Sequence, residues 1–436
     1  MNNMSRLASA LIVSLPALLG LGCGSGTASD SPDTAVAADS AAPSDGSAAV
    51  ATDSAGTGPA GLAVIHGDKN YTSSLLSLVD PATGALVHDN CLNSGSMAPQ
   101  LSQALSGDVV LPSAPLPGHP LVIIDRGNSA LLWVSPADCT VIREIGVGTG
   151  FTADPHDVVA VAPNKFYVTR YSTNLKPTAD PSDLDEGADL LVLDLDLGKP
   201  VARIDLSPYA SGGAGINANP DRARALGGKI YITLNDLNAD PSQTGGPGRV
   251  VVVDPTTDTV SSVIELPGFK DCGAIVPVPG QDGSLAVACS GDFADGANQI
   301  QNSGVALIDT SVSPPSVRPL MAAAFGGALS FADLAVVSPT LGFAIVPGGM
   351  AGSPPDSLWQ FDFTRGVPQK VLSADSAWVL GGLVLDLDTQ RVFLGDANAQ
   401  SPKLHVFDVS ASAPVELSSL SSDPAKGLLP RFLGLY

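Results

Sequence analysis

A short apolar run ending in aspartate recurs along most of the chain, and its spacing is the feature that most constrains the fold. Six copies end at an aspartate, and in the copy "ALLWVS" Ser135 takes its place. The six aspartates are Asp80, Asp194, Asp254, Asp309, Asp362 and Asp408. Counting Ser135 as the second copy, successive intervals are 55, 59, 60, 55, 53 and 46 residues. A period of this length is typical of folds that repeat one supersecondary unit.

Each period contains four short strand patterns at hairpin spacing. The aspartate run is followed by turn residues and a second strand, and two further strands separated by a short turn precede the next copy. One four-stranded sheet cannot cover both of its faces, but sheets stacked radially cover one another. The sequence therefore predicts an all-β fold over residues 61–436, a seven-bladed β-propeller with four antiparallel strands per blade.

One stretch connects this pattern with a known repeat family. Residues 155–171, "PHDVVAVAPNKFYVTRY", contain an apolar strand, a Pro-Asn turn and a Tyr-Val-Thr strand. This stretch resembles the YVTN repeat of seven-bladed propellers, and "KIYITLND" at 229–236 is a looser copy. The resemblance implies the fold and implies nothing about chemistry.

The strand pattern also predicts how the ring closes. The domain begins with "GLAVIHG" and "LLSLVD", so its first blade has no innermost strand of its own. The sequence ends in the apolar segment "LLPRFLGLY", for which no further blade remains. We expect residues 428–436 to supply the missing inner strand, and a ring closed in this way predicts a monomer.

The first 23 residues have the features of an export signal. Arg6 provides a positive charge, and an apolar run from Leu7 to Leu21 is short for a membrane span. The run ends in "LLGLGC", which resembles the lipobox of bacterial lipoproteins, with Gly20 where that family usually has leucine. The resemblance implies lipid attachment to Cys23, and the alternative is an ordinary secretory peptide.

Residues 24–60 predict a flexible tether between the lipid and the propeller. They contain no Lys, no Arg and no aromatic residue, so they cannot bury enough apolar surface to fold. Gly24 follows Cys23, so the aspartate that usually retains lipoproteins at the inner membrane is missing. We therefore expect an envelope protein anchored in the outer membrane rather than the inner one. The propeller would lie in the periplasm or at the cell surface.

The remaining four cysteines predict two disulfides, as is usual in an exported chain. Cys272 and Cys289 flank a hairpin with the turn "PGQDG", which places them opposite each other. By elimination Cys91 pairs with Cys139. Metal ligation is the alternative, but the sequence has no C-x-x-C spacing.

The net charge of −22 excludes a phosphate backbone as a favourable partner, so we expect no nucleic-acid binding. It is compatible with cations or basic partners. A protein or polysaccharide in the envelope is therefore the kind of partner we expect, besides the membrane itself.

His156 and Asp157 stand where the chain enters the inner strand of the third blade, near the expected mouth of the central channel. They could ligate a metal or act as base and orienting group. The alternative is a structural role in which they bond to loop backbone and to each other. No second histidine occupies the equivalent position in other blades.

Long acidic connections in blades three, four and five are expected on one face of the ring, and such loops often carry function. One of them contains Asp236, Asn238 and Asp240, whose spacing could offer oxygen ligands to Ca²⁺. It lacks the glycine and glutamate of a complete calcium loop, so a solvated acidic rim is the alternative. No other cofactor is indicated.

These features favour a binding or scaffolding module that acts through its acidic, loop-rich face. The alternative is an enzyme at the channel mouth, a metal-assisted hydrolase or a lactonase. The sequence has no G-x-S-x-G or H-E-x-x-H motif, and its glycine-rich segments lack the context of a phosphate loop.

The lipid anchor leads to the first prediction. Cys23→Ala should release the protein from membranes into the soluble envelope fraction, because the thiol that would carry the lipid is gone. Ser25→Ala in the tether is the control and should stay with the membrane pellet. Persistent membrane association of Cys23→Ala in fractionated cells would contradict lipidation.

Overall fold

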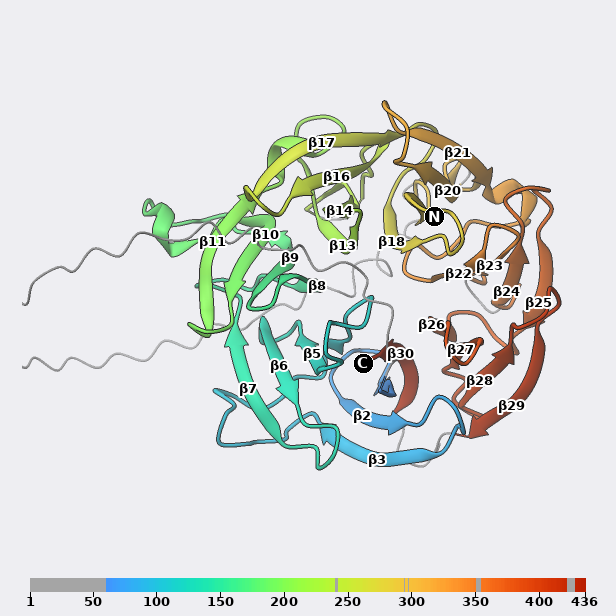
Figure 1. Ribbon diagram of the computed structural model, residues 1–436, viewed down its shortest axis with the longest axis horizontal. Helices are drawn as coiled ribbons and strands as arrows, with labels where there is room; N and C mark the ends of the chain where they lie inside the picture. Colours follow the sequence, from blue (N-terminus) through green and yellow to red (C-terminus); the bar gives the residue numbers. More distant parts are fainter. Residues whose placement is uncertain (1–59, 240–241, 294, 297, 350–353, 422–427) are drawn as a thin grey trace, which may run out of the picture. The chain divides into compact units, whose positions relative to one another are not determined.

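The computed structural model describes residues 60–436 except 240–241, 294, 297, 350–353 and 422–427. Thirty strands of this part form seven four-stranded antiparallel sheets in a ring and one additional two-stranded sheet (Figure 1). The predicted all-β, seven-bladed propeller is confirmed. The signal segment 1–23 and all but the last residue of the tether 24–60 lie outside the described residues.

Within each blade the strands follow one another from the channel outward. Blade 1 contains β30 (Leu429–Leu435), β1 (Leu62–Gly67), β2 (Ser74–Val79) and β3 (Leu86–Asn93). Blade 2 contains β4 (Val109–Val110), β5 (Leu121–Asp125), β6 (Ala130–Val134) and β7 (Val141–Gly146). Blade 3 contains β8 (Pro155–Ala162), β9 (Lys165–Thr173), β10 (Gly187–Asp194) and β11 (Lys199–Asp205). Blade 4 contains β13 (Pro220–Leu226), β14 (Lys229–Leu234), β16 (Gly248–Asp254) and β17 (Thr259–Leu266).

Blade 5 contains β18 (Cys272–Pro277), β19 (Ser284–Cys289), β20 (Gly304–Asp309) and β21 (Ser316–Met321). Blade 6 contains β22 (Leu334–Ser338), β23 (Leu341–Val346), β24 (Ser357–Phe361) and β25 (Gln369–Ser373). Blade 7 contains β26 (Leu380–Asp386), β27 (Arg391–Asp396), β28 (Lys403–Asp408) and β29 (Val415–Ser421). The small sheet pairs β12 (Ile216–Asn217) with β15 (Leu237–Asn238). Four short 3₁₀ turns are η1 (Pro181–Asp183), η2 (Ser207–Tyr209), η3 (Gln299–Gln301) and η4 (Ala322–Ala324).

The last strand closes the ring as the sequence predicts. β30 pairs with β1 in antiparallel register from Leu62 opposite Leu435 to Gly67 opposite Leu429. Beyond the ladder, Gly61 and Tyr436 exchange two main-chain hydrogen bonds of 3.1 Å. Blade 1 is therefore assembled from both ends of the domain, and Figure 1 shows β30 next to the first strands of the chain.

The hydrophobic core lies between the blades. Strand β16 shows how: Val251 and Val253 pack toward blade 3, whereas Val250 and Val252 pack toward blade 5. Successive strand residues point to opposite faces, so one apolar run fills two interfaces. Seven apolar clusters occupy the seven interfaces in this way. Because both faces of each inner strand are covered, the runs are continuously hydrophobic rather than alternating.

The repeated aspartates have a structural role. Each ends the third strand of its blade, and its carboxylate accepts main-chain N–H bonds from the turn that follows. Asp362 Oδ1, for example, accepts from the backbone of Thr364 at 2.6 Å and of Arg365 at 3.2 Å. The same arrangement occurs at Asp80, Asp194, Asp254, Asp309 and Asp408.

Both expected cysteine pairs are at disulfide distance. Cys272 and Cys289 face each other on β18 and β19 with their Cα atoms 4.0 Å apart. Cys91 on β3 is bonded to Cys139 in the turn between β6 and β7, so this disulfide joins blade 1 to blade 2.

Ring closure leads to the second prediction. Deletion of residues 428–436 should unfold or oligomerise the domain, because it exposes the inner edge of β1 and opens the interface between blades 7 and 1. A point variant measures how much the closing strand contributes to stability. Leu433 is buried in that interface, so Leu433→Ala should lower the free energy of unfolding by about 2–5 kcal/mol. Urea titration and light scattering measure the two effects.

Leu417 on the outer strand β29 provides the matched control, because 48% of its surface is exposed. Leu417→Ala should change the free energy of unfolding by less than about 0.5 kcal/mol. A deletion variant that stays monomeric with an unchanged melting temperature would refute closure by β30.

Candidate functional site

The connections that carry the candidate residues share one face of the ring, which we call the loop face. It comprises the links between blades and the connections between the second and third strands of each blade. Contacts between the two kinds of connection show this: Lys270 in the link before blade 5 forms an ion pair of 2.7 Å with Asp292 in the β19–β20 connection. In blade 4, β12 of the link pairs with β15 of the β14–β16 connection. The inner strands start at this face, so their first residues surround the channel mouth.

His156, the second residue of β8, is held between two carboxylates. Its Nδ1 lies 2.7 Å from Asp221 Oδ1, and its Nε2 lies 3.5 Å from Asp154 Oδ2. The imidazole stacks on Tyr171 with ring centroids 4.1 Å apart. Burial alone would lower the pKa of His156, but the charges and hydrogen bonds of Asp154 and Asp221 outweigh it and raise the pKa. The two carboxylates therefore favour the protonated ring, and each of its nitrogens faces one of them.

Asp221 is the central anion of this group. Burial would raise the pKa of Asp221, but Arg222 and His156 outweigh burial and lower it. Its Oδ1 faces His156, whereas Oδ2 is buried and has no hydrogen-bond partner among the described residues. Arg126 connects the group to blade 2 through an ion pair with Asp108 at 2.5 Å and lies 4.0 Å from Asp154.

Asp157, the next residue along β8, has its own hydrogen-bond partners and ties three blades together. Its carboxylate accepts from the Ser113 backbone and hydroxyl at 2.9 and 2.5 Å, and from the Ala223 backbone at 2.9 Å. The β8–β9 register shifts between Pro155 and Asp157, so simple alternation does not apply at His156, but the hydrogen bonds of His156 and Asp157 go to different partners. Their role as joint metal ligands stays a prediction, and the structure gives each of them other partners.

Two of the three proposed calcium ligands form hydrogen bonds within the protein, and the third lies outside the described residues. Asp236 is buried and accepts from the Ser211 backbone at 3.1 Å and its hydroxyl at 2.7 Å. Asn238 Oδ1 accepts the Gln243 N–H at 2.8 Å. Asp240 lies outside the described residues. Within the described part of the chain no group of three or more His, Cys, Asp or Glu side chains could hold a metal, so this site also stays a prediction.

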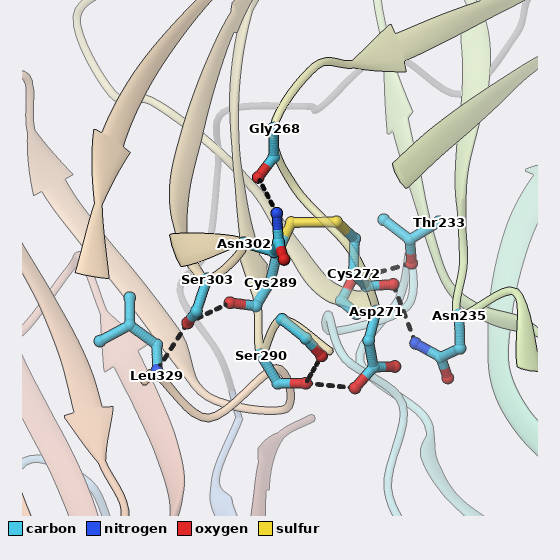
Figure 2. Close-up of a disulfide and its surroundings, with 12 residues drawn as sticks. Thr233, Asn235, Gly268, Asp271, Cys272, Cys289, Ser290, Asn302, Ser303 and Leu329 are labelled. Carbon is cyan, nitrogen blue, oxygen red and sulfur yellow. Dashed lines mark hydrogen bonds between the residues drawn. A yellow bond between two sulfur atoms is a disulfide. The ribbon is translucent and has the colours of Figure 1, made fainter. Parts of the chain in front are cut away.

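A further buried acid, Asp271, lies next to the disulfide of blade 5. Asp271 precedes Cys272, and its carboxyl accepts a hydrogen bond from the Ser290 hydroxyl, next to Cys289 (Figure 2). Burial raises the pKa of Asp271 to about 7, and the charges of Asp221, Asp236 and Asp292 add to the shift. Burial likewise raises the pKa of Asp236 to about 7. The loop face thus contains two carboxyls that titrate near neutrality.

A cavity of about 260 Å³ lies on the axis and is lined by residues of blades 1, 2, 4, 5, 6 and 7. Most of its wall is aliphatic, and its polar and aromatic lining residues include Arg222, Arg431, Asp333, Trp378 and Tyr71. The lining residues extend from the beginnings of the inner strands of blades 6 and 7, on the loop-face side, to positions further along β18, β26 and β30. Sequence reasoning found the strands but not these residues, because they are scattered over more than 350 positions and share no motif.

No family model matches the chain, and no curated protein matches its sequence. The fold is similar to a putative 6-phosphogluconolactonase from Bacteroides uniformis, with a TM-score of 0.52 and 13% identity over 86% of this chain and 98% of that one. It is also similar to a prolyl endopeptidase (TM-score 0.45, 14% identity, 84% of this chain and 49% of that one). A hypothetical selenium-binding protein from Sulfolobus tokodaii gives a TM-score of 0.42 and 9% identity over 84% and 76% of the two chains. At these identities the likeness shows the fold alone.

No described helix is long and apolar enough to cross a membrane.

The buried acids lead to the third prediction. Since the folded-state pKa values of Asp236 and Asp271 are raised from 3.8 to about 7, the folded protein retains two protons that the unfolded chain has released between about pH 4 and pH 7. Stability should therefore fall as the pH rises through this window, each group contributing up to about 1.4 kcal/mol per pH unit. The raised pKa of His156 acts in the same direction, with stability lost as the pH rises through its folded value.

Urea unfolding at pH 5, 6, 7 and 8 measures the slope. Asp271→Asn preserves an acceptor for Ser290 and should make the slope shallower. Asp309→Asn is the control, because the lowered pKa of this exposed turn carboxyl lies outside the window. Equal slopes in all three proteins would show that Asp271 is ionised throughout.

Proposed function

We propose that the chain is a cell-envelope lipoprotein whose propeller, of the YVTN type, is a binding module with its ligand site where the axial cavity meets the loop face. The axial cavity is the observation that supports this most strongly. Ligand sites are concave, mainly apolar, and contain a few polar groups that fix orientation. The cavity combines those features, with aliphatic walls, two arginines and three aromatic residues.

The acidic rim alone supports binding less well, because its carboxylates already have partners. In the β9–β10 connection, Asp185 accepts from the Thr178 backbone at 3.0 Å and Asp183 accepts from the Thr178 hydroxyl at 2.7 Å. Asp180 caps η1 through Ser182. These bonds order the loop, so the rim shapes the entrance and the cavity provides the space.

Placement in the envelope rests on the sequence and on the cysteines. The lipobox-like "LLGLGC" and the tether motivate the anchor at Cys23. The cysteine pairs Cys91–Cys139 and Cys272–Cys289 add support, because disulfides persist in oxidising compartments.

An enzyme at the channel mouth is the second candidate, and the Asp154–His156–Asp221 group favours it. Buried groups with shifted pKa values are concentrated in active sites. As a base, however, His156 is poorly placed, since both of its nitrogens already face carboxylates, which raise its pKa. Binding therefore explains the arrangement better than proton transfer.

Closing the entrance tests the proposed site. Ala332 is exposed and lines the cavity, so Ala332→Trp should block access without disturbing the core. The control is Ala82→Trp, at an exposed position in the β2–β3 turn on the opposite face. Thermal shifts are measured for both variants with a panel of sugars, organic acids, divalent cations and peptides.

We expect a stabilising ligand that raises the melting temperature of the wild type and of Ala82→Trp but not of Ala332→Trp. A ligand that stabilises all three proteins equally would place its site elsewhere. Turnover of a lactone or ester, lost in His156→Asn, would establish the enzyme instead.

A further inference from the structure

We infer that the axial cavity binds a small organic anion, a carboxylate carried on a six-membered ring, with the ring on Trp378 and Tyr71 and the carboxylate on Arg431. This inference deepens the proposed function and rests on it, because it specifies the ligand of the same cavity.

Two aromatic residues at the cavity are held in a backbone conformation that bulky side chains rarely adopt. Trp378 has φ of +63° and Tyr71 has φ of +56°, and both side chains line the cavity. A bulky residue in the left-handed region is an outlier, and such strain is concentrated at ligand-binding sites. The two positions therefore point to a function for these rings beyond packing.

A buried carboxylate holds Trp378 in place. Asp356 in the β23–β24 connection accepts the main-chain N–H of Trp378 at 2.9 Å, of Val379 at 2.7 Å and of Leu380 at 2.8 Å. The backbone is fixed, yet 61% of the Trp378 surface is exposed. A fixed backbone under an exposed indole gives a preorganised stacking surface for a flat ligand.

Tyr71 forms a second aromatic surface with the closing strand. Its ring lies 6.4 Å from that of Phe432 on β30, measured between centroids. Tyr71 follows β1 and Phe432 is on the adjacent β30, so this wall exists only when the ring is closed.

The cavity contains positive charge inside an acidic protein. Arg431 of β30 donates from Nε to the Gly67 carbonyl at 3.2 Å and forms no ion pair with any described residue. Arg222 lies 3.6 Å from Asp221 and donates to the His156 carbonyl at 2.8 Å. Against a net charge of −22, a guanidinium without a carboxylate partner in the described structure is a site for an external anion.

The one carboxylate among the lining residues does not compete for these arginines at short range. Asp333 accepts the Gly382 and Leu383 N–H groups at 2.8 and 3.1 Å, and its other oxygen accepts the Ser330 hydroxyl at 2.8 Å. One of its oxygens therefore joins blade 6 to blade 7, and the other is used within the link that leads into blade 6.

These observations define the ligand by its chemistry. A guanidinium fork binds a carboxylate through two parallel hydrogen bonds, and the indole and phenol rings stack on a flat or apolar ring face. A cavity of about 260 Å³ is large enough for one such ring but not for an extended chain. Aromatic acids and sugar acids share this chemistry, and the experiment distinguishes them.

The test uses the full-length chain in mild detergent, titrated with benzoate and, separately, with D-glucuronate. Trp378 is the most exposed of the three tryptophans, so a ring stacked on it should change the intrinsic fluorescence. We expect at least one acid to bind saturably, and its neutral counterpart, methyl benzoate or D-glucose, to bind at least about tenfold more weakly. This ligand-side comparison needs no variant.

Variants locate the site. Arg431→Gln should weaken binding of the acid at least about tenfold, whereas Arg318→Gln, on the exposed outer strand β21, should leave it unchanged. Trp378→Phe should preserve binding measured by calorimetry but remove most of the fluorescence change.

If only benzoate binds, the ligand class is an aromatic acid. If only glucuronate binds, it is a sugar acid. Absence of binding by both acids, or equal affinity for acid and neutral compound, overturns the inference. If a different ligand stabilises the wild type but not Ala332→Trp, the binding module remains established and only the inference of an anionic ligand is wrong.

Discussion

The ladder between β1 and β30 is the interaction on which the rest of the structure depends. Each blade buries its two faces against its neighbours, so an open ring would leave two apolar faces in water. The pairing of Leu62–Gly67 with Leu429–Leu435 removes those open faces and completes the cluster between blades 7 and 1. It also brings Arg431 and Phe432 to the axis, so the cavity wall and the closure of the ring are made by the same strand.

Buried carboxylates give the ring a second kind of connection. Asp157, Asp333 and Asp356 each accept main-chain N–H bonds from a neighbouring blade, at the face where the inner strands begin. Hydrophobic contacts between blades are not directional, whereas these bonds fix how each inner strand enters the channel. The desolvation they require raises the pKa of Asp157 and Asp333, so the bonds that shape the mouth also make it sensitive to pH.

The repeating features of the fold could be predicted from the sequence, whereas residues that matter in only one blade could not. Period, strand order, the closing strand and both cysteine pairs follow from patterns that recur or must be completed, as Cys272 and Cys289 do across their hairpin. The partners of His156 were not predictable, because Asp221 lies 65 positions away and only the ring brings the two together. His156 and Asp157 are adjacent in sequence, which suggested a pair, but in the structure their hydrogen bonds go to different partners. Trp378 and Arg431 belong to no repeat, so no periodic signal marks them.

The separation of β1 and β30 along the chain also governs the order in which the fold forms. Its partner β1 begins at Leu62, and the residue opposite Leu62 is Leu435, which emerges more than 370 residues later. Until then, blade 1 lacks its innermost strand and β1 presents an unpaired edge. Contacts of such separation form slowly because a long loop must be ordered first. Closure of the ring is therefore a late step of folding, and the interface between blades 7 and 1 is the last of the seven to be completed.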